Sequence, residues 1–253
     1  MIMLKKRLIA VIIVNDNKVI QTKNFNHTNI IHYDPVFSVE AMGKWSLDEL
    51  IIINASKKNN SNQFLKLIYK ISKKIFLPLT VGGWVDNIEY SRKLLLAGAD
   101  KILVNSAFYY NKKFIKNFVE IFGSQCLVAS VDTKREKNKD IAYIDRCRLS
   151  TGTETIKWCK IVSKMGAGEI FLNSYENDGT DKGLYLKLFK KISSNFDIPT
   201  ILFGGVSSWD HLAKGFKTNA SAVAAANIFH YSENAATNAK EYLLKKKFLL
   251  RND

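Results

Sequence analysis

Val81-Gly82-Gly83 closes a short apolar run and is followed by a segment of helical periodicity and a second apolar run that ends at Asn105. Phe203-Gly204-Gly205 opens the same series later in the chain, and that series ends at Asn227. The same number of residues separates Gly82 from Asn105 and Gly204 from Asn227. Two distant segments therefore share one design, which predicts a molecule built from two similar halves.

Short apolar runs alternate with longer amphipathic segments along the whole chain, a pattern typical of a parallel sheet with crossover helices. We predict eight strands, at residues 8–14, 50–54, 79–81, 101–104, 125–131, 169–173, 200–203 and 222–226. Between them we predict helices at residues 64–75, 88–97, 114–122, 155–165, 185–196 and 209–216. This series predicts an α/β fold, a single (βα)₈ TIM barrel over residues 1–253 made of two similar (βα)₄ halves.

The composition is that of an ordinary globular protein, with 47% hydrophobic and 24% charged residues. The apolar stretch at residues 8–14 is too short to span a bilayer, so we expect neither a signal peptide nor a membrane span. Three cysteines without CxxC spacing, Cys126, Cys147 and Cys159, indicate a reducing cytoplasm, with Cys126 a small core residue in a strand. Because no metal-binding constellation, P-loop or nucleophile elbow is present, we expect no metal and no cofactor.

The net charge of +15 comes from lysines spread along the whole chain, with only short runs such as Lys245-Lys246-Lys247. No basic stripe interleaved with aromatic residues appears, so we interpret the charge as a lysine-rich surface and expect no nucleic-acid partner. A mild attraction for anionic, phosphorylated small molecules is expected under this interpretation. Nucleic-acid binding remains a distant alternative.

The loops at the carboxyl ends of the strands should hold the site, as they do in (βα)₈ barrels. Glycine pairs there let the backbone approach a ligand closely, and the helix that follows presents N–H groups to an anion. We predict two phosphate cradles at this end, the alternative being that the glycines only make tight turns. The second-half cradle consists of Asp178, Gly179, Gly204, Gly205, Ala226 and Asn227, and the first-half cradle of Gly82, Gly83, Asn105 and Ser106.

Asp132 ends the fifth predicted strand and should point into the same mouth. A carboxylate there can serve as a general acid or base if burial raises its pKa. The alternative is an aspartate that caps the next element. His32 and His230 lie in loops, and we expect surface residues rather than catalysts at both positions.

At these positions the whole chain resembles the cyclase subunit of imidazole glycerol phosphate synthase. The stretches that carry the resemblance are Leu4-Lys5-Lys6-Arg7-Leu8-Ile9-Ala10, Thr80-Val81-Gly82-Gly83, Gly98-Ala99-Asp100-Lys101, Asn105-Ser106-Ala107, Phe122-Gly123-Ser124-Gln125, Gly166-Ala167-Gly168-Glu169-Ile170, Asp178-Gly179-Thr180 and Ile228-Phe229-His230. The resemblance implies a heterodimer with a glutaminase docked on the amino-terminal face of the barrel. It also implies that ammonia passes through the barrel's centre to the site.

The resemblance places a ring of two basic and two acidic residues, the ammonia gate, on Arg7, Glu49, Lys101 and Glu169, and a glutaminase-facing residue on Asp100. Charges at the amino ends of four strands cannot stay unpaired inside a barrel, so a ring of opposite charges is also the arrangement expected from physics. A purely structural ring is the alternative.

The catalytic face departs from the family's pattern. The resemblance implies paired aspartates at the ends of strands 1 and 5, but only Asp132 is present and Ile13 stands at the strand-1 position. Asn54 replaces the strand-2 carboxylate, and Trp84 replaces the third glycine of the first phosphate loop. Asn227 replaces the usual serine of the second phosphate loop.

These departures resemble a branch of proteins that serve acetamidino modification of surface-polysaccharide sugars. The resemblance implies that a glutaminase and possibly a sugar amidotransferase work with this chain, and we favour this over histidine biosynthesis because Ile13 cannot transfer a proton. Two alternatives stay open. One is an orthodox cyclase of histidine biosynthesis, and the other is a non-catalytic scaffold that docks and activates the glutaminase.

Overall fold

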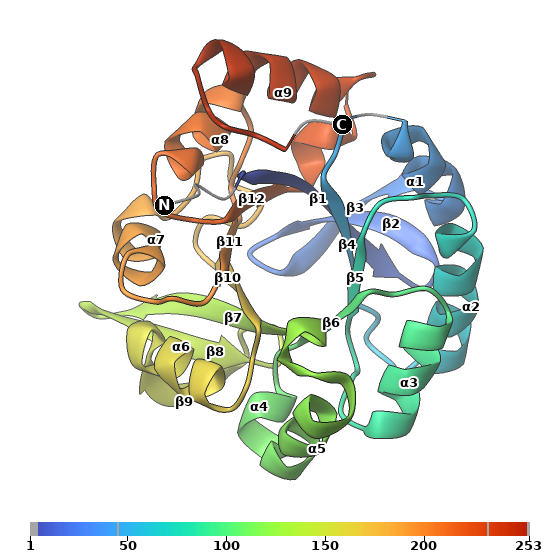
Figure 1. The fold of residues 1–253 in the computed structure, drawn as a ribbon, viewed down its shortest axis with the longest axis vertical. Helices are drawn as coiled ribbons and strands as arrows, with labels where there is room; N and C mark the ends of the chain where they lie inside the picture. The colour runs from blue at the N-terminus through green and yellow to red at the C-terminus, as the bar shows by residue number, and fades with distance from the viewer. Residues whose placement is uncertain (1–4, 45, 232, 252–253) are drawn as a thin grey trace.

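Eight parallel strands close into a ring in the computed structural model, which describes residues 5–44, 46–231 and 233–251 (Figure 1). The ring consists of β1 (Arg7–Asn15), β4 (Glu49–Asn54), β5 (Leu79–Gly82), β6 (Lys101–Val104), β7 (Leu127–Glu136), β10 (Glu169–Ser174), β11 (Thr200–Phe203) and β12 (Ala222–Ala225). Each strand pairs in parallel with the next, and β12 pairs with β1 to close the ring. The predicted (βα)₈ barrel is therefore confirmed.

Helices lie around the outside of this ring and cover every side of it (Figure 1). They are α1 (Pro35–Gly43), α2 (Ser61–Ser72), α3 (Ile88–Leu96), α4 (Ala107–Tyr110), α5 (Lys112–Phe122), α6 (Thr155–Lys164), α7 (Leu186–Ser193), α8 (Trp209–Phe216) and α9 (Ala235–Lys245). Two short 3₁₀ helices, η1 (Ser124–Cys126) and η2 (Asn227–Phe229), complete the set within the described residues. The sequence prediction missed α1, α4 and α9. It was also wrong to place Gln125 and Cys126 in a strand, because they form η1, where Cys126 is only half-buried.

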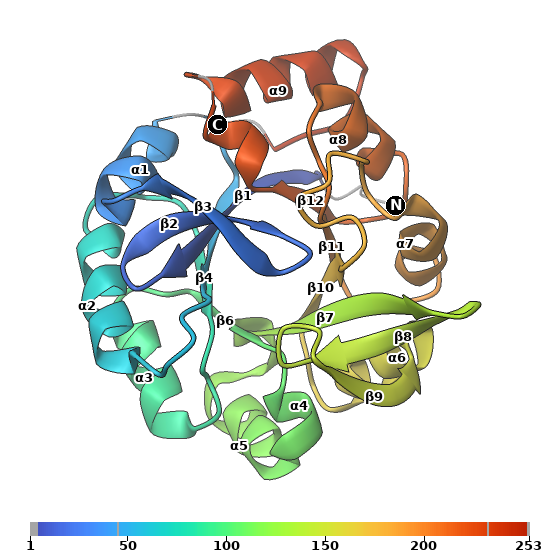
Figure 2. The same cartoon turned by 180° about the vertical axis from the view of Figure 1, so that it is seen from behind.

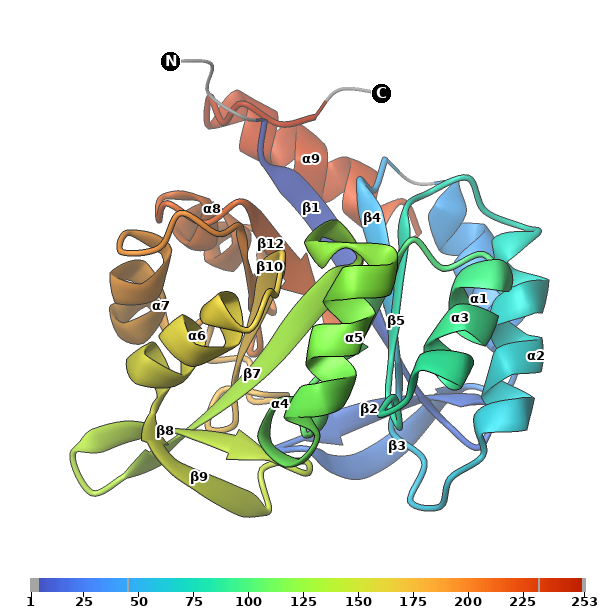
Figure 3. The same ribbon diagram turned by 60° about the horizontal axis from the view of Figure 1, so that its bottom comes forward.

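Two antiparallel hairpins extend the first strand of each half, and neither was predicted. β2 (Lys18–Lys23) and β3 (Asn26–His32) continue from β1, while β8 (Lys139–Ile144) and β9 (Leu149–Glu154) continue from β7. Both hairpins lie at the carboxyl end of the barrel, opposite the two chain termini (Figure 3). As a result β7 does not end at Asp132 as predicted but runs on to Glu136.

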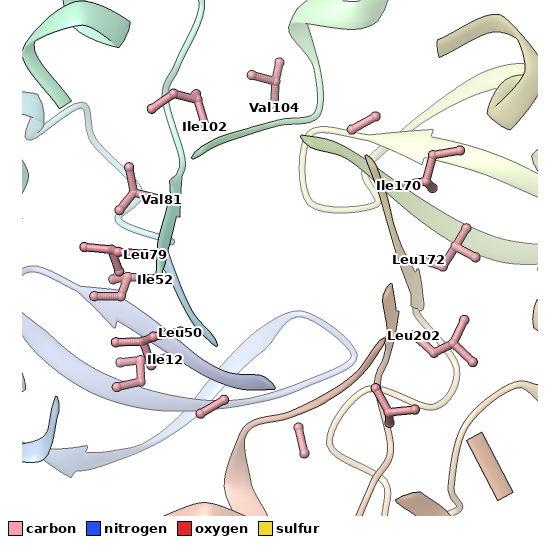
Figure 4. Packing of buried hydrophobic residues seen from close by; sticks show 14 of the residues in the cluster. Ile12, Leu50, Ile52, Leu79, Val81, Ile102, Val104, Ile170, Leu172 and Leu202 are labelled. Atoms are coloured by element: carbon pink, nitrogen blue, oxygen red, sulfur yellow. The ribbon is translucent and has the colours of Figure 1, made fainter. Parts of the chain in front are cut away.

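Alternate side chains of the barrel strands point to opposite sides of the ring, as strand geometry requires. Residues such as Ile12, Leu50 and Leu172 point outward and pack against the helices (Figure 4). A second, smaller cluster fills the inside of the barrel, and it consists of Ile9, Val11, Ile51, Leu103, Val128, Phe171, Ile201, Phe203, Ala222 and Ala224. The charged residues that face inward lie at the two ends of this interior, while Thr80 and Ser130 are small polar residues in the same layer as Ile51 and Phe171.

The two halves repeat in space, but one residue out of the register that the sequence suggested. Gly83 and Gly204 both have a φ of 103°, and the helices that follow begin at Ile88 and Trp209, each after a cap whose side chain accepts a hydrogen bond from the backbone. Gly204 therefore corresponds to Gly83 and not to Gly82. Gly82 ends β5 and packs against β6, where a Cβ atom would lie 2.7 Å from the carbonyl oxygen of Leu103.

Candidate active site

At the carboxyl end of the barrel, the inward-facing residues of the first two strands are polar in the second half and apolar in the first. β1 pairs with β4 in the same register as β7 pairs with β10, so Ile13 corresponds to Asp132 and Ile53 to Asn173. Asp132 and Asn173 are buried neighbours on β7 and β10, whereas Ile13 and Ile53 pack against the apolar interior. The internal symmetry of the fold is thus broken in the side chains at the mouth.

Asp132 is a fully buried carboxylate with an altered pKa. Loss of water around it, together with the negative charge of Asp178, raises its pKa from 3.8 to about 7. Asn105 Nδ2 donates to Asp132 Oδ2 at 3.2 Å and to the carbonyl oxygen of Ser130 at 3.0 Å. A carboxyl group that titrates near neutral pH can give or take a proton, so this position has the chemistry of a general acid or base.

Asp178, predicted in the second phosphate cradle, holds the β2–β3 hairpin with its carboxylate. That carboxylate accepts hydrogen bonds from the backbone N–H of Phe25 at 2.9 Å and from the Thr22 hydroxyl at 3.1 Å. Burial raises its pKa, while these two hydrogen bonds act in the opposite direction. Asn24 Nδ2 also donates to the carbonyl oxygen of Tyr175, so the hairpin tip is fixed to the loop after β10 and crosses the mouth (Figure 2).

The other residues of the second cradle line one pocket at the mouth, beside the start of α8. Gly204 and Gly205 have φ values of 103° and 83°, which favour glycine, and the carbonyl oxygen of Gly205 accepts from the Gly183 N–H at 2.7 Å. The pocket is lined by Ile13, Thr22, Asp178, Gly179, Asp181, Phe203, Gly204, Gly205, Val206, Ala225, Ala226 and Asn227. The structure therefore brings together all six residues predicted for this cradle.

The first cradle is occupied by side chains of the protein itself. Trp84 has a φ of 60° at the position that corresponds to Gly205, and its Nε1 donates to the carbonyl oxygen of Ser56 at 3.0 Å. The Arg146 guanidinium donates to the same carbonyl oxygen and lies 6.0 Å from the Trp84 ring. The Ser106 hydroxyl accepts from the backbone N–H of Asp145 at 3.1 Å. Gly83 and Ser106 are thus in the predicted loops, but Trp84 and the β8–β9 turn cover them.

Asn105 and Asn54 form side-chain hydrogen bonds at the carboxyl ends of β6 and β4. Asn105 donates from Nδ2 toward Asp132 and accepts at Oδ1 from the hydroxyl of its first-cradle neighbour Ser106 at 3.2 Å. Asn54 donates to Asn60 Oδ1 at 2.7 Å and accepts from the backbone N–H of Ser56 at 3.1 Å. Its amide therefore orders the loop between β4 and α2.

The four charged residues predicted as a gate form a closed ring at the amino end of the barrel. Arg7 bonds Glu49 at 2.7 Å and also bonds Glu169, while Lys101 bonds Glu169 at 2.8 Å and lies 3.9 Å from Glu49. Burial lowers the pKa of Arg7, but the two glutamates outweigh burial and raise it. The pairing satisfies charges that would otherwise be buried alone.

Asp100 lies next to this ring and is exposed, apart from one role in the fold. Its Oδ2 accepts a hydrogen bond from the backbone N–H of Leu79 at 2.7 Å, which joins the starts of β5 and β6. The exposed side of this residue faces outward from the amino end of the barrel, where a partner could reach it.

Comparison with known protein families identifies the family to which the chain is related. The profile of the family described as "Histidine biosynthesis protein" matches residues 7–235. The chain belongs to this family.

Relatives within the histidine biosynthesis protein family cover nearly the whole chain. A protein named "Imidazole glycerol phosphate synthase subunit HisF" from Clostridium botulinum (strain Langeland / NCTC 10281 / Type F) is 38% identical over 253 residues, which is 98% of this chain and 100% of the relative. A protein of the same name from Bacillus cereus (strain G9842) is 37% identical over 244 residues, 95% of this chain and 96% of the relative. In the described ranges no helix is long and apolar enough to cross a membrane, and no group of three or more His, Cys, Asp and Glu could hold a metal ion.

Several residues at the mouth of the barrel were not predicted from the sequence. Asn173 ends an apolar strand and was not assigned to the site, while Thr22, Arg146 and Cys147 lie in hairpins that were not predicted. Cys147 is buried, and its pKa is raised by burial and then by Asp132. It therefore stays a neutral thiol near the carboxylate.

The two loop histidines are not the surface residues that the sequence suggested. Both are half-buried, and their rings lie 5.5 Å apart. Burial, with His32 nearby, lowers the pKa of His230 to about 4. His230 is therefore neutral at pH 7 and packs the end of β3 against the loop after β12.

Proposed function

We propose that this chain is the cyclase-type subunit of a cytoplasmic, ammonia-using synthase. A glutaminase subunit docks over the charged ring and Asp100 at the amino end, and the ammonia that it releases travels along the barrel axis to Asp132. The observation that carries the proposal is the placement of the two polar ends: a closed charged ring at one end of the apolar interior and a buried carboxyl group with a pKa of about 7 at the other. The membership of the chain in the histidine biosynthesis protein family supports it.

The reaction at the mouth uses a phosphorylated small molecule held at the pocket around Gly204 and Gly205. Glycine backbone at positive φ beside the start of a helix is suited to an anion. Asp132 then acts as the proton-transferring group. In the first half, Ile13 and Ile53 occupy the positions that correspond to Asp132 and Asn173. The carboxyl group of Asp132 therefore performs both the acid and the base steps.

The acceptor that we propose is a surface-polysaccharide sugar, whose N-acetyl group becomes an acetamidino group with the help of a sugar amidotransferase. The apolar first half of the mouth supports this choice, since Ile13 can transfer no proton. Trp84 and Arg146 support the same acceptor. They cover the first cradle, so the pocket around Gly204 and Gly205 is the one that we assign to an anion.

A second candidate is the cyclase reaction of histidine biosynthesis. The observation that favours it is the identity of 38% over the full length of a relative named for imidazole glycerol phosphate synthase. It requires the single carboxyl group of Asp132 to perform the complete reaction.

Turnover of the histidine-pathway ribonucleotide separates the two candidates. The purified chain is mixed with this ribonucleotide and an ammonium salt at pH 8.5, and the products are followed by chromatography. We expect no imidazole glycerol phosphate and no aminoimidazole ribotide. Robust turnover that Asp132→Asn abolishes and Asp16→Asn spares would instead establish the second candidate, because Asp16 is an exposed turn residue.

A third candidate, a scaffold that only activates the glutaminase, is tested by damaging the pocket. A Cβ atom at Gly179 would lie 2.0 Å from the carbonyl oxygen of Thr22, and one at Gly205 would lie 2.5 Å from that of Gly183. Gly205→Ala should abolish amidation in the reconstituted system. If glutaminase stimulation and sugar amidation both survive this change, the scaffold interpretation is correct.

A further inference from the structure

Asn173 stands at the centre of the mouth, on the strand that also supplies a glutamate of the charged ring. Glu169, Phe171 and Asn173 alternate along β10 and face the inside of the barrel. Strand geometry places such residues about 7 Å apart, so one column of side chains runs from the ring past Phe171 to Asn173. Asn173 is therefore the residue of this column that lies at the mouth.

The amide oxygen of Asn173 is a buried acceptor that no described residue satisfies. The side chain is only 6% exposed, and no donor of the described chain lies within hydrogen-bond distance of Oδ1. Leaving such a group unpaired costs about 1–3 kcal/mol. Native proteins rarely keep such a group unless a ligand or an ordered water uses it.

The unsatisfied Oδ1 of Asn173 can pair only with a group that donates a hydrogen bond. Asp132 lies opposite it in the pairing of β7 with β10, and Gly204 lies so close that a Cβ atom there would be 2.8 Å from Asn173 Oδ1. The ionised carboxylate of Asp132 repels an anion, so the phosphate of a substrate does not belong next to it. A small, neutral or cationic N–H donor fits.

The side-chain amide of Asn105, on the β6 side of Asp132, acts as a hydrogen-bond donor rather than an acceptor toward this region. Asn105 donates to Asp132 Oδ2 and is already satisfied. Asp132 thus has a donor on the β6 side and an unsatisfied acceptor on the β10 side. A molecule bound between Asp132 and Asn173 would have its N–H groups directed at two oxygen atoms.

We propose that Asn173 binds ammonia, accepting one of its N–H bonds at Oδ1 and holding it beside Asp132. The inference rests on the proposed function, because it assumes that ammonia reaches the mouth through the barrel. With one N–H directed at Asn173 and another at the Asp132 carboxylate, the nitrogen lone pair is left for the acceptor in the pocket at Gly204. When the nitrogen lone pair forms a bond to a carbonyl-type carbon of the acceptor, the carbon–oxygen π bond opens, its electron pair moves to that oxygen, and one ammonia proton passes to the Asp132 carboxylate.

Binding of ammonium can be measured without knowing the acceptor. The full chain is titrated with ammonium chloride at pH 7.5, and ¹⁴N NMR line broadening reports the bound fraction. Asn173→Leu, which keeps the branched shape but removes the acceptor, should weaken binding about tenfold, the loss expected for one hydrogen bond. Asn173→Asp keeps an acceptor and should bind at least as tightly. Asn219→Leu, at an exposed asparagine remote from the mouth, is the control.

A kinetic measurement separates this inference from the proposed function. If the histidine-pathway ribonucleotide is turned over, Asn173→Leu should raise the KM for ammonium about tenfold and change kcat less than about threefold. If that acceptor is not turned over, the NMR titration alone decides the role of Asn173. Equal broadening by the unmodified protein and Asn173→Leu, or no broadening by the unmodified protein, would overturn the proposal. Circular dichroism confirms that each variant is folded.

Discussion

Replacing Asp132 by Asn should stabilise the protein, and the gain should depend on pH. The pKa of Asp132 is raised to about 7 in the folded state, against 3.8 for the exposed group in the unfolded chain. Below pH 4 both states hold the proton, so the burial of this carboxyl group carries no charge penalty. As the pH rises toward 7, the unfolded chain ionises while the folded protein does not, and the free energy of unfolding falls.

The size of this effect follows from the two pKa values. A difference of about three corresponds to ~4 kcal/mol at about 1.36 kcal/mol for each pH unit. Because Asp132 is fully buried, solvent screening reduces this figure little. The amide that Asp132→Asn introduces stays neutral at every pH. The stability advantage of this variant should therefore be about 0.6 kcal/mol at pH 4, about 1.7 kcal/mol at pH 5 and about 4 kcal/mol at pH 7.

Urea unfolding followed by circular dichroism at five pH values between 4 and 8 measures this difference. Asp16→Asn, which changes an exposed carboxylate in the β1–β2 turn, is the control and should differ little from the unmodified protein. A difference for Asp132→Asn that does not change with pH would refute the reasoning. It would mean that water reaches Asp132 and that the group is not suited to proton transfer near pH 7.

Three further predictions concern the ring and the two cradles. Glu169→Gln removes the shared partner of Arg7 and Lys101 and should lower the free energy of unfolding by about 3 kcal/mol in urea titrations, while an unchanged midpoint would show that the ring contributes nothing. Gly204→Ala should cost about 3 kcal/mol and abolish binding of inorganic phosphate, whereas Gly152→Ala, also at positive φ but with open space around it, should cost about 1 kcal/mol. Trp84→Gly should open the first cradle, so that calorimetry counts two bound phosphates in place of one; a constant count would show that Trp84 is not the obstacle.

The barrel could be predicted from sequence because its strands carry their own signals. Runs such as that of β4 are apolar on both faces and stand between amphipathic helices, a pattern with few structural solutions. The hairpins could not be predicted in the same way. β3 is mostly exposed and polar, and its place is fixed by distant contacts such as that between Phe25 and Asp178.

The site was predictable as far as its residues lie at strand ends. Asp132 and the second-half glycines follow directly from the strand pattern; the structure puts the glycines in one pocket and Asp132 opposite Asn173, whose Oδ1 lies beside Gly204. The burial that raises the pKa of Asp132 depends on the hairpins and on Asp178, which is distant in sequence. The unsatisfied oxygen of Asn173 could not be predicted from the sequence, because it depends on the lack of a hydrogen-bond donor on the neighbouring strands in the described structure.

The four residues of the charged ring are divided unequally between the two halves of the barrel. Arg7, Glu49 and Lys101 belong to the first half, and only Glu169, the counterpart of Glu49, belongs to the second. Two copies of the first half would bring four cations against two glutamates, and two copies of the second would bring two glutamates with no cation. Duplication of either half as it now stands would therefore not give this ring, which draws on residues that differ between the halves.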